Sequence, residues 1–138
     1  MTVDVGGVEV RAFVPMPIDE VPRQVAKLQI QSSPLEPLET VSELPATLTD
    51  ALVVAVTPHV EMSWGKSAAQ CAHAAQLLWR QADAERLDAW NGADRSISVI
   101  APTPPLWDQL STTAEVAVHD AGYTEIPAGT NTTVAWWT

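Results

Sequence analysis

The run from Ala51 to Thr57 (ALVVAVT) most constrains the fold of this chain, because it is unbroken, apolar and rich in β-branched residues. Such a run is typical of a strand that is covered on both faces of a sheet. The segment 67–83 follows it, is rich in strong helix formers and contains neither Gly nor Pro. This segment therefore predicts a helix soon after the buried strand.

The rest of the second half alternates between the same two kinds of element. The expected elements are strands at 95–101, 114–120 and 131–137, and short helices at 85–90 and 104–111. Asn91-Gly92 is expected to close the first short helix, and Pro104 to begin the second. This order predicts an α/β fold with a small mixed four-stranded sheet flanked by helices. The hairpin-like end implies at least one antiparallel pair of strands.

The first fifty residues have a different character, and they predict an N-terminal extension (1–50) ahead of the main domain (51–138). Residues 8–14 alternate well enough for a short strand, which a Pro-marked turn follows. Residues 21–30 are interpreted as one helical turn that runs into a strand. The stretch 32–49 is rich in Pro, Ser/Thr and Glu, a composition that indicates a linker or a meandering arm.

Charge limits the kinds of partner that this chain can have. Seven Lys and Arg residues against seventeen Asp and Glu residues give a net charge of −10, shared evenly between residues 1–50 and 51–138. Proteins that bind nucleic acid normally present a basic surface, so any contact with a nucleic acid must rest on a local site.

Three further features of the sequence bear on where the protein works. No run of 18 or more apolar residues is present, which excludes a membrane-spanning helix in this sequence. The N-terminal residues do not resemble a secretory signal. A single cysteine, Cys71, agrees with a reducing compartment. We therefore expect a cytoplasmic protein.

Residues 62–74 (MSWGKSAAQCAHA) hold the first group of candidate functional residues. A flexible Gly65 just ahead of a helix, with Lys66 in its first turn, predicts a site for a phosphate or a developing oxyanion. Lys66, Gln70 and His73 are spaced to share one helical face. The alternative is that Gln70 and His73 are core polar groups bonded to backbone. A P-loop is excluded, because the upstream Gly is missing and position 60 is Val.

Residues 119–130 (HDAGYTEIPAGT) hold the second group. An acid at the end of a strand, Asp120, precedes a loop with two glycines and two threonines. This is a common place for a catalytic carboxylate. The alternative is an Asp that only accepts hydrogen bonds from its own turn.

Together the two segments resemble the two signatures of the type 2 peptidyl-tRNA hydrolase family. The first resembles Gly-Lys-x-Ala-Ala-Gln-Cys-x-His-Ala, and the second resembles Asp-Ala-Gly-x-Thr-x-Ile followed by Gly-Thr and a closing strand. The resemblance covers about residues 51–138. It implies hydrolysis of the ester that joins a peptide to the 3′ ribose of tRNA, without a metal or other cofactor, by a homodimer.

The resemblance also assigns roles to residues. It implies four catalytic residues, which are Lys66, Gln70, Asp120 and Thr130, and four substrate-binding residues, which are Gly65, His73, Thr124 and Gly129. Asp120 is expected to position or deprotonate the attacking water, and Lys66 to hold the oxyanion or the terminal phosphate. Some positions depart from the family pattern: Tyr123 stands where Arg is common, Glu125 where Gln is common, and Ala128 separates Pro127 from the Gly that usually follows it directly. The helix expected at 104–111 is also shorter than its counterpart in the family.

Two alternatives to this hydrolase stay open at the level of sequence. One is a catalytically altered relative, which acts on another acyl ester or serves as a non-catalytic binding module. The other is a structural subunit. The charge around Lys66 distinguishes the hydrolase from the catalytically altered relative. A basic patch of Lys66, Arg80 and Arg95 would support binding of tRNA, whereas an acidic surface around the site would argue against it.

Overall fold

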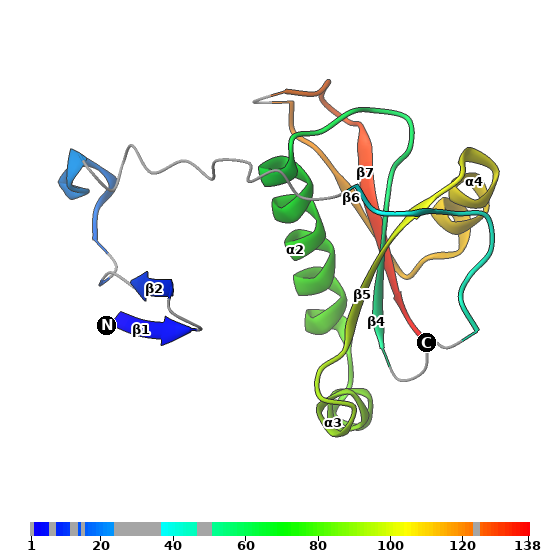
Figure 1. Ribbon diagram of the computed structural model, residues 1–138, viewed down its shortest axis with the longest axis horizontal. Helices are drawn as coiled ribbons and strands as arrows, with labels where there is room; N and C mark the ends of the chain where they lie inside the picture. The colour runs from blue at the N-terminus through cyan, green and yellow to red at the C-terminus, as the bar shows by residue number, and fades with distance from the viewer. Residues whose placement is uncertain are drawn as a thin grey trace. The chain divides into compact units, whose positions relative to one another are not determined.

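The structure is a computed structural model, and it describes residues 2–5, 8–11, 14, 16–23, 37–46, 51–122 and 125–138 (Figure 1). The chain forms two compact units, Met1–Gln31 and Ser32–Thr138. Each unit is described by itself.

The first unit contains a two-stranded antiparallel sheet. Strand β1 (Thr2–Val5) pairs with β2 (Val8–Arg11), and a short 3-10 helix, η1, covers Ile18–Glu20. The strand expected at 8–14 therefore ends at Arg11, and its partner β1 was not predicted. The helix-to-strand interpretation of 21–30 falls mostly on residues 24–30, which lie outside the described residues.

The second unit is built on a five-stranded mixed sheet in the order β3-β5-β4-β7-β6. The strands are β3 (Thr40–Val41), β4 (Leu52–Val56), β5 (Ile97–Pro102), β6 (Val116–His119) and β7 (Asn131–Trp137). Strand β4 is parallel to β5, and β5 to β3, while β7 is antiparallel to both β4 and β6. The expected antiparallel pair at the end of the chain is therefore confirmed.

The prediction of four strands was wrong by one strand. The additional strand, β3, comes from the segment expected to be a linker, and its two residues pair with Ala101 and Pro102 at the end of β5. The N–H of Thr103 also donates to the carbonyl of Val41. A two-residue strand is too short to show an alternating pattern in the sequence. Its formation depends on pairing with β5, about sixty residues later in the chain.

Two layers of helix cover the sheet. Helix α2 (Trp64–Gln81) packs against β4, β6 and β7 on one face, and α4 (Pro104–Thr113) lies on the other face (Figure 1). Helix α3 (Ala84–Gly92) follows α2. Asn91 and Gly92 lie inside α3 and do not close it. The chain turns afterwards at Asp94 and Arg95, which both have positive φ. In the described part of the chain, no helix is long and apolar enough to cross a membrane.

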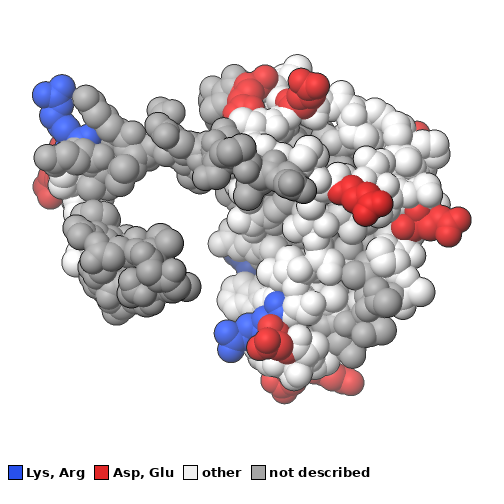
Figure 2. Space-filling model, viewed as in Figure 1, with Lys and Arg blue, Asp and Glu red and all other residues white. Residues whose placement is uncertain are grey.

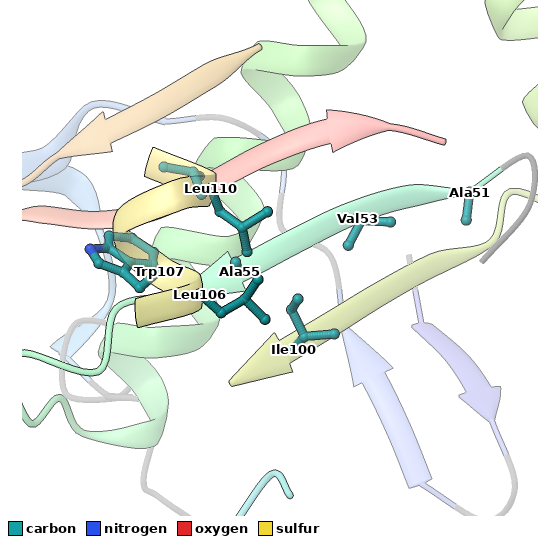
Figure 3. Close-up of a cluster of buried hydrophobic side chains, with 8 residues drawn as sticks. Ala51, Val53, Ala55, Ile100, Leu106, Trp107 and Leu110 are labelled. Carbon is teal, nitrogen blue, oxygen red and sulfur yellow. The ribbon is translucent and has the colours of Figure 1, made fainter. Parts of the chain in front are cut away.

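The core has two halves because β4 is buried on both faces. Val53 and Ala55 point to the α4 side, where they pack with Ile100, Leu106, Trp107 and Leu110 (Figure 3). Leu52 and Val54 point to the α2 side, where they pack with Ala74, Leu78 and Val118. The unbroken apolar run of β4 thus serves both layers, as its composition predicted.

The topology also brings distant segments to one edge of the sheet. Strands β3, β4, β5 and β6 all run in the same direction, so their carboxyl ends meet at that edge. Helix α2 follows β4 after a short loop, and its N-terminus therefore begins there. Asp120, the residue after β6, reaches the same edge. Ligands of parallel α/β sheets commonly bind at this edge.

Leu78 and Leu77 offer a matched test of the α2 interface. Leu78 is fully buried beneath α2, whereas its neighbour Leu77 is 38% exposed. We expect Leu78→Ala to lower the free energy of unfolding by about 2–5 kcal/mol, because it removes buried methyl groups and leaves a cavity. Leu77→Ala should change it by no more than about 0.5 kcal/mol. Urea denaturation measures both, and equal losses would show that α2 packs differently.

Candidate active site

Asp120 is the centre of a group of hydrogen bonds at the carboxyl edge of the sheet. Its side chain is nearly buried, and its Oδ2 accepts from Lys66 Nζ, with which it forms an ion pair, and from Gln70 Nε2 at 2.9 Å. Its Oδ1 accepts from the backbone N–H of Gly122 at 2.8 Å. Lys66 and Asp120, 54 positions apart, are thus in direct contact, as the two sequence signatures predicted.

These contacts stabilise the ionised form of the carboxylate. The hydrogen bond from Lys66 and then that from Gly122 lower the pKa of Asp120 below its ordinary value of 3.8, and the nearby positive charge and Gln70 act in the same direction. Burial opposes this change, because it favours the neutral form. The carboxylate is therefore ionised at neutral pH.

Gln70 is held in place from both ends of its amide. Its Nε2 donates to Asp120, and its Oε1 accepts from Thr132 Oγ1 at 2.7 Å. Thr133 Oγ1 donates to the backbone carbonyl of Gln70 at 3.1 Å. Gln70 is therefore a buried residue bonded chiefly to other side chains through its amide, which differs from the alternative of a core group tied to backbone.

Thr132 and Thr133 were missed by the sequence analysis. Neighbouring residues of a regular strand point to opposite faces, but a β-bulge lies here, because His119 pairs with Asn131 and Val118 with Thr133. Thr132 is the extra residue, so both threonines reach α2. The signal in the sequence was two adjacent threonines beside the apolar residues of this strand, whose hydroxyls need hydrogen-bond partners once the strand is buried.

The loop after Asp120 folds back on that residue. The backbone N–H of Gly129 donates to the Asp120 carbonyl at 2.7 Å, and the Asp120 N–H donates to the Thr130 carbonyl at 2.9 Å. The Thr130 hydroxyl donates to Pro127 O at 2.7 Å. Thr130 and Gly129 therefore shape the loop that holds Asp120. In this structure the hydroxyl of Thr130 is engaged in its own turn.

The N-terminus of α2 is capped by a serine, and an acidic side chain binds that serine. The helix begins at Trp64, so Gly65 lies inside its first turn and not ahead of it, which corrects the expected boundary. Ser63 is the N-cap, and its Oγ accepts from the Lys66 N–H. The carboxylate of Glu125 accepts from Ser63 N at 2.8 Å and from Ser63 Oγ at 2.5 Å. These bonds from Ser63 lower the pKa of Glu125.

His73, one of the expected substrate-binding residues, stands apart from this group. His73 is exposed on α2, and the side-chain donors to Asp120 among the described residues are Lys66 and Gln70. The structure therefore does not bring His73 to the carboxylate. Thr124 and the departing residue Tyr123 lie outside the described residues.

The basic patch that would support tRNA is not assembled around Lys66. Arg80 is on the same helix fourteen residues later, which corresponds to about 21 Å of helix. Arg95 follows α3 and bonds to Asn91. In Figure 2, the Lys and Arg atoms seen on the second unit lie towards the end where α3 lies, and acidic side chains are scattered over the visible surface, that end included. Lys66 instead lies near two carboxylates, Asp120 and Glu125.

The described residues contain no cluster of three or more His, Cys, Asp or Glu side chains that could hold a metal ion. The chemistry available from the geometry is that of an ionised carboxylate beside a lysine, with a buried amide behind both. Such a group orients water or a polar substrate atom and stabilises a developing negative charge.

The fold and this group of residues define an α/β protein with a buried carboxylate, a lysine and an amide at the carboxyl edge of its sheet. Comparison with known families shows which one: residues 51–136 match the peptidyl-tRNA hydrolase PTH2 family. The chain belongs to this family, which confirms the resemblance of the two signatures. None of the curated proteins with which the sequence was compared matches it.

The pKa of Asp120 predicts how stability depends on pH. A carboxyl whose pKa is lower in the folded state stabilises the fold above its unfolded pKa, and that contribution is lost as pH falls towards the folded pKa. The native protein should therefore be more stable than Asp120→Asn at pH 6. The difference should shrink as the pH falls below 3.8. Urea denaturation at several pH values measures it, and a difference that does not change with pH would contradict the ionised Asp120.

Gly122 and Gly129 test the loop that holds Asp120. Both have positive φ, but an added Cβ at Gly122 would lie 2.6 Å from Ala128, whereas at Gly129 it would meet nothing within 4 Å. We expect Gly129→Ala to cost about 1–2 kcal/mol through backbone strain alone. Gly122→Ala should cost more and should raise the pKa of Asp120, because it displaces a donor. NMR titration and urea denaturation measure these effects, and equal costs would refute the close packing.

Proposed function

We propose that this protein hydrolyses the ester of peptidyl-tRNA and releases the peptide and the tRNA. The observation that carries the proposal is the ionised Asp120, held by Lys66 and Gln70 at the carboxyl edge of the sheet, in a chain of the peptidyl-tRNA hydrolase family. An aminoacyl ester is an activated ester, so one water-orienting group and one cation are sufficient for useful catalysis.

The hydrogen bonds of Asp120 favour one of its two expected roles. A carboxylate accepts about four hydrogen bonds, and three are taken by Lys66, Gln70 and Gly122. The position left on Oδ1 can accept a proton of the attacking water. Because the pKa of Asp120 is lowered, the carboxylate is a weak base. We assign it to orienting the water and not to removing its proton.

The other residues complete the proposed reaction. The water oxygen bonds to the ester carbon, the bond from that carbon to the ribose oxygen breaks, and a proton of the water ends on that oxygen. Lys66 stabilises the negative charge that develops on the carbonyl oxygen. Gln70 keeps Asp120 aligned, while Thr130 and Gly129 act through the loop that they fix around Asp120. We keep Gly65, His73 and Thr124 as residues that contact substrate.

Three broader expectations belong to the same proposal. The family resemblance implies a homodimer, and the reaction implies that the protein works in the cytoplasm, where peptidyl-tRNA is formed. The division into an N-terminal extension (1–50) and a hydrolase domain (51–138) is also part of the proposal.

One observation favours a second candidate, a relative of the family that binds without catalysis or acts on another acyl ester. Glu125 occupies the helix N-terminus beside Lys66, where a phosphate would otherwise find backbone donors and a positive dipole. Glu125 and Asp120 together place two carboxylates near one lysine. This arrangement repels an anionic substrate.

Asp120→Asn tests the hydrolase directly. We expect the substitution to lower the rate of peptidyl-tRNA hydrolysis by about 10²-fold, because the amide places an N–H group where the carboxylate accepted bonds and no longer orients the attacking water. Asp108→Asn is the matched control, since Asp108 is exposed on α4 and faces His59. Peptide release from purified peptidyl-tRNA, measured over time, provides the rate.

Two results would contradict the hydrolase in favour of the second candidate. The first is the absence of turnover by the native protein together with tight tRNA binding. The second is an equal rate for Asp120→Asn, Asp108→Asn and the native protein.

A further inference from the structure

An uncharged groove runs beside α2 on the side away from Lys66. It consists of two cavities of about 470 Å³ and 240 Å³, which share Leu38, Val56, Trp64 and Ser67. Ala68 and Cys71 extend its wall on α2, and Val99 extends it on β5. The described residues that line it include no charged side chain, in a chain whose net charge is −10.

The groove is open because α2 does not cover the whole sheet. Among the described residues, the helix packs on β4, β7 and β6 and leaves β5 largely uncovered on that face. Ile97 and Val99 of β5 are consequently 52% and 38% exposed, and Leu38 is 42% exposed. A concave, apolar surface of this size is typical of a site for a small ligand or a short segment of chain.

A chain of hydrogen bonds links the wall of the groove to Asp120. Thr57 lines the larger cavity, and its N–H donates to the Thr132 carbonyl. Thr132 in turn bonds to Gln70, which bonds to Asp120. Thr57 follows β4 and Asp120 follows β6, with β7 between them. Two strand spacings separate the groove from Asp120, or about 10 Å, the length of about three residues of extended peptide.

We propose that this groove holds apolar side chains of the peptide, about three residues before the ester. This inference rests on the proposed function and names the part of the substrate that the groove takes. Peptidyl-tRNA has an anionic half and a largely neutral half. An uncharged apolar wall attracts the neutral half and offers no cation to tRNA phosphates.

The test compares substrates that reach the groove with one that does not. Tetrapeptidyl-tRNAs with Leu or Asp three residues before the ester reach it, whereas N-acetyl-aminoacyl-tRNA does not. We expect the native protein to prefer Leu over Asp by about tenfold in kcat/KM. Ala68→Phe, which fills the groove, should abolish this preference and leave N-acetyl-aminoacyl-tRNA unaffected. Ala68 is exposed and lies two residues after Lys66, so its side chain points to the opposite side of α2.

Two further variants test whether the loss of preference is specific to the groove. Ala72→Phe is the matched control, because Ala72 is exposed on α2 but lines neither cavity, and it should keep the preference. Leu38→Asp places a charge in the groove and should abolish the preference through another element. Urea denaturation confirms that each variant is folded.

Binding of a free peptide separates this inference from the proposed function. The N-acetylated tetrapeptide amide with Leu at the same position should shift the NMR methyl signals of Leu38 and Val99, and Ala68→Phe should remove the shifts. Hydrolysis without a Leu preference, or no binding of the peptide, overturns the groove while the hydrolase stands. Peptide binding without hydrolysis of either kind of substrate supports the groove and overturns the hydrolase.

Discussion

The ion pair between Lys66 and Asp120 joins the first turn of α2 to the end of β6, and much of the local structure serves to maintain it. Its side chains are only 13% and 6% exposed, so both charges have lost most of their water. Such a pair is stable only where further hydrogen bonds replace that water. Gln70 and the N–H of Gly122 provide them, and the tight turn at Gly122 exists to place that N–H.

The sheet determines where this pair can form. Because β4 and β6 are parallel and β7 lies between them, the N-terminus of α2 and the residue after β6 reach one edge at a separation of two strands. The side chain of Lys66 spans part of that distance. The bulge at Thr132 directs the Thr132 hydroxyl towards Gln70, to which it donates a hydrogen bond. The groove lies on the other side of α2, where Val56 of β4 and Val99 of β5 line it, so the polar site and the apolar groove are two sides of one helix.

Long elements with a strong pattern could be predicted from the sequence, and short or cooperative features could not. The apolar run of β4 and the Gly- and Pro-free helix α2 depend on their own residues, and both were placed within a few positions. Strand β3 has two residues and depends on β5. Lys66, Gln70 and Asp120 were found because a family pattern marks them, whereas Thr132 acts through a bulge that only strand pairing reveals. Glu125 was noticed as a departure, but its bond to Ser63 depends on how the loop folds.

If the protein acts on peptidyl-tRNA as proposed, the charges at the site show that recognition of tRNA cannot rest on electrostatic attraction alone. One lysine lies among two carboxylates, and the pKa values of both carboxylates are lowered, so this group carries a net negative charge at neutral pH. A phosphate that approaches Lys66 must compete with Asp120 and is repelled by Glu125. The free energy of binding must then come from uncharged contacts, and the groove along α2 offers such contacts close to the carboxylate. In the proposed reaction, the peptide half of the substrate therefore contributes more to binding than the tRNA half, which would allow an acidic protein to act on an anionic substrate.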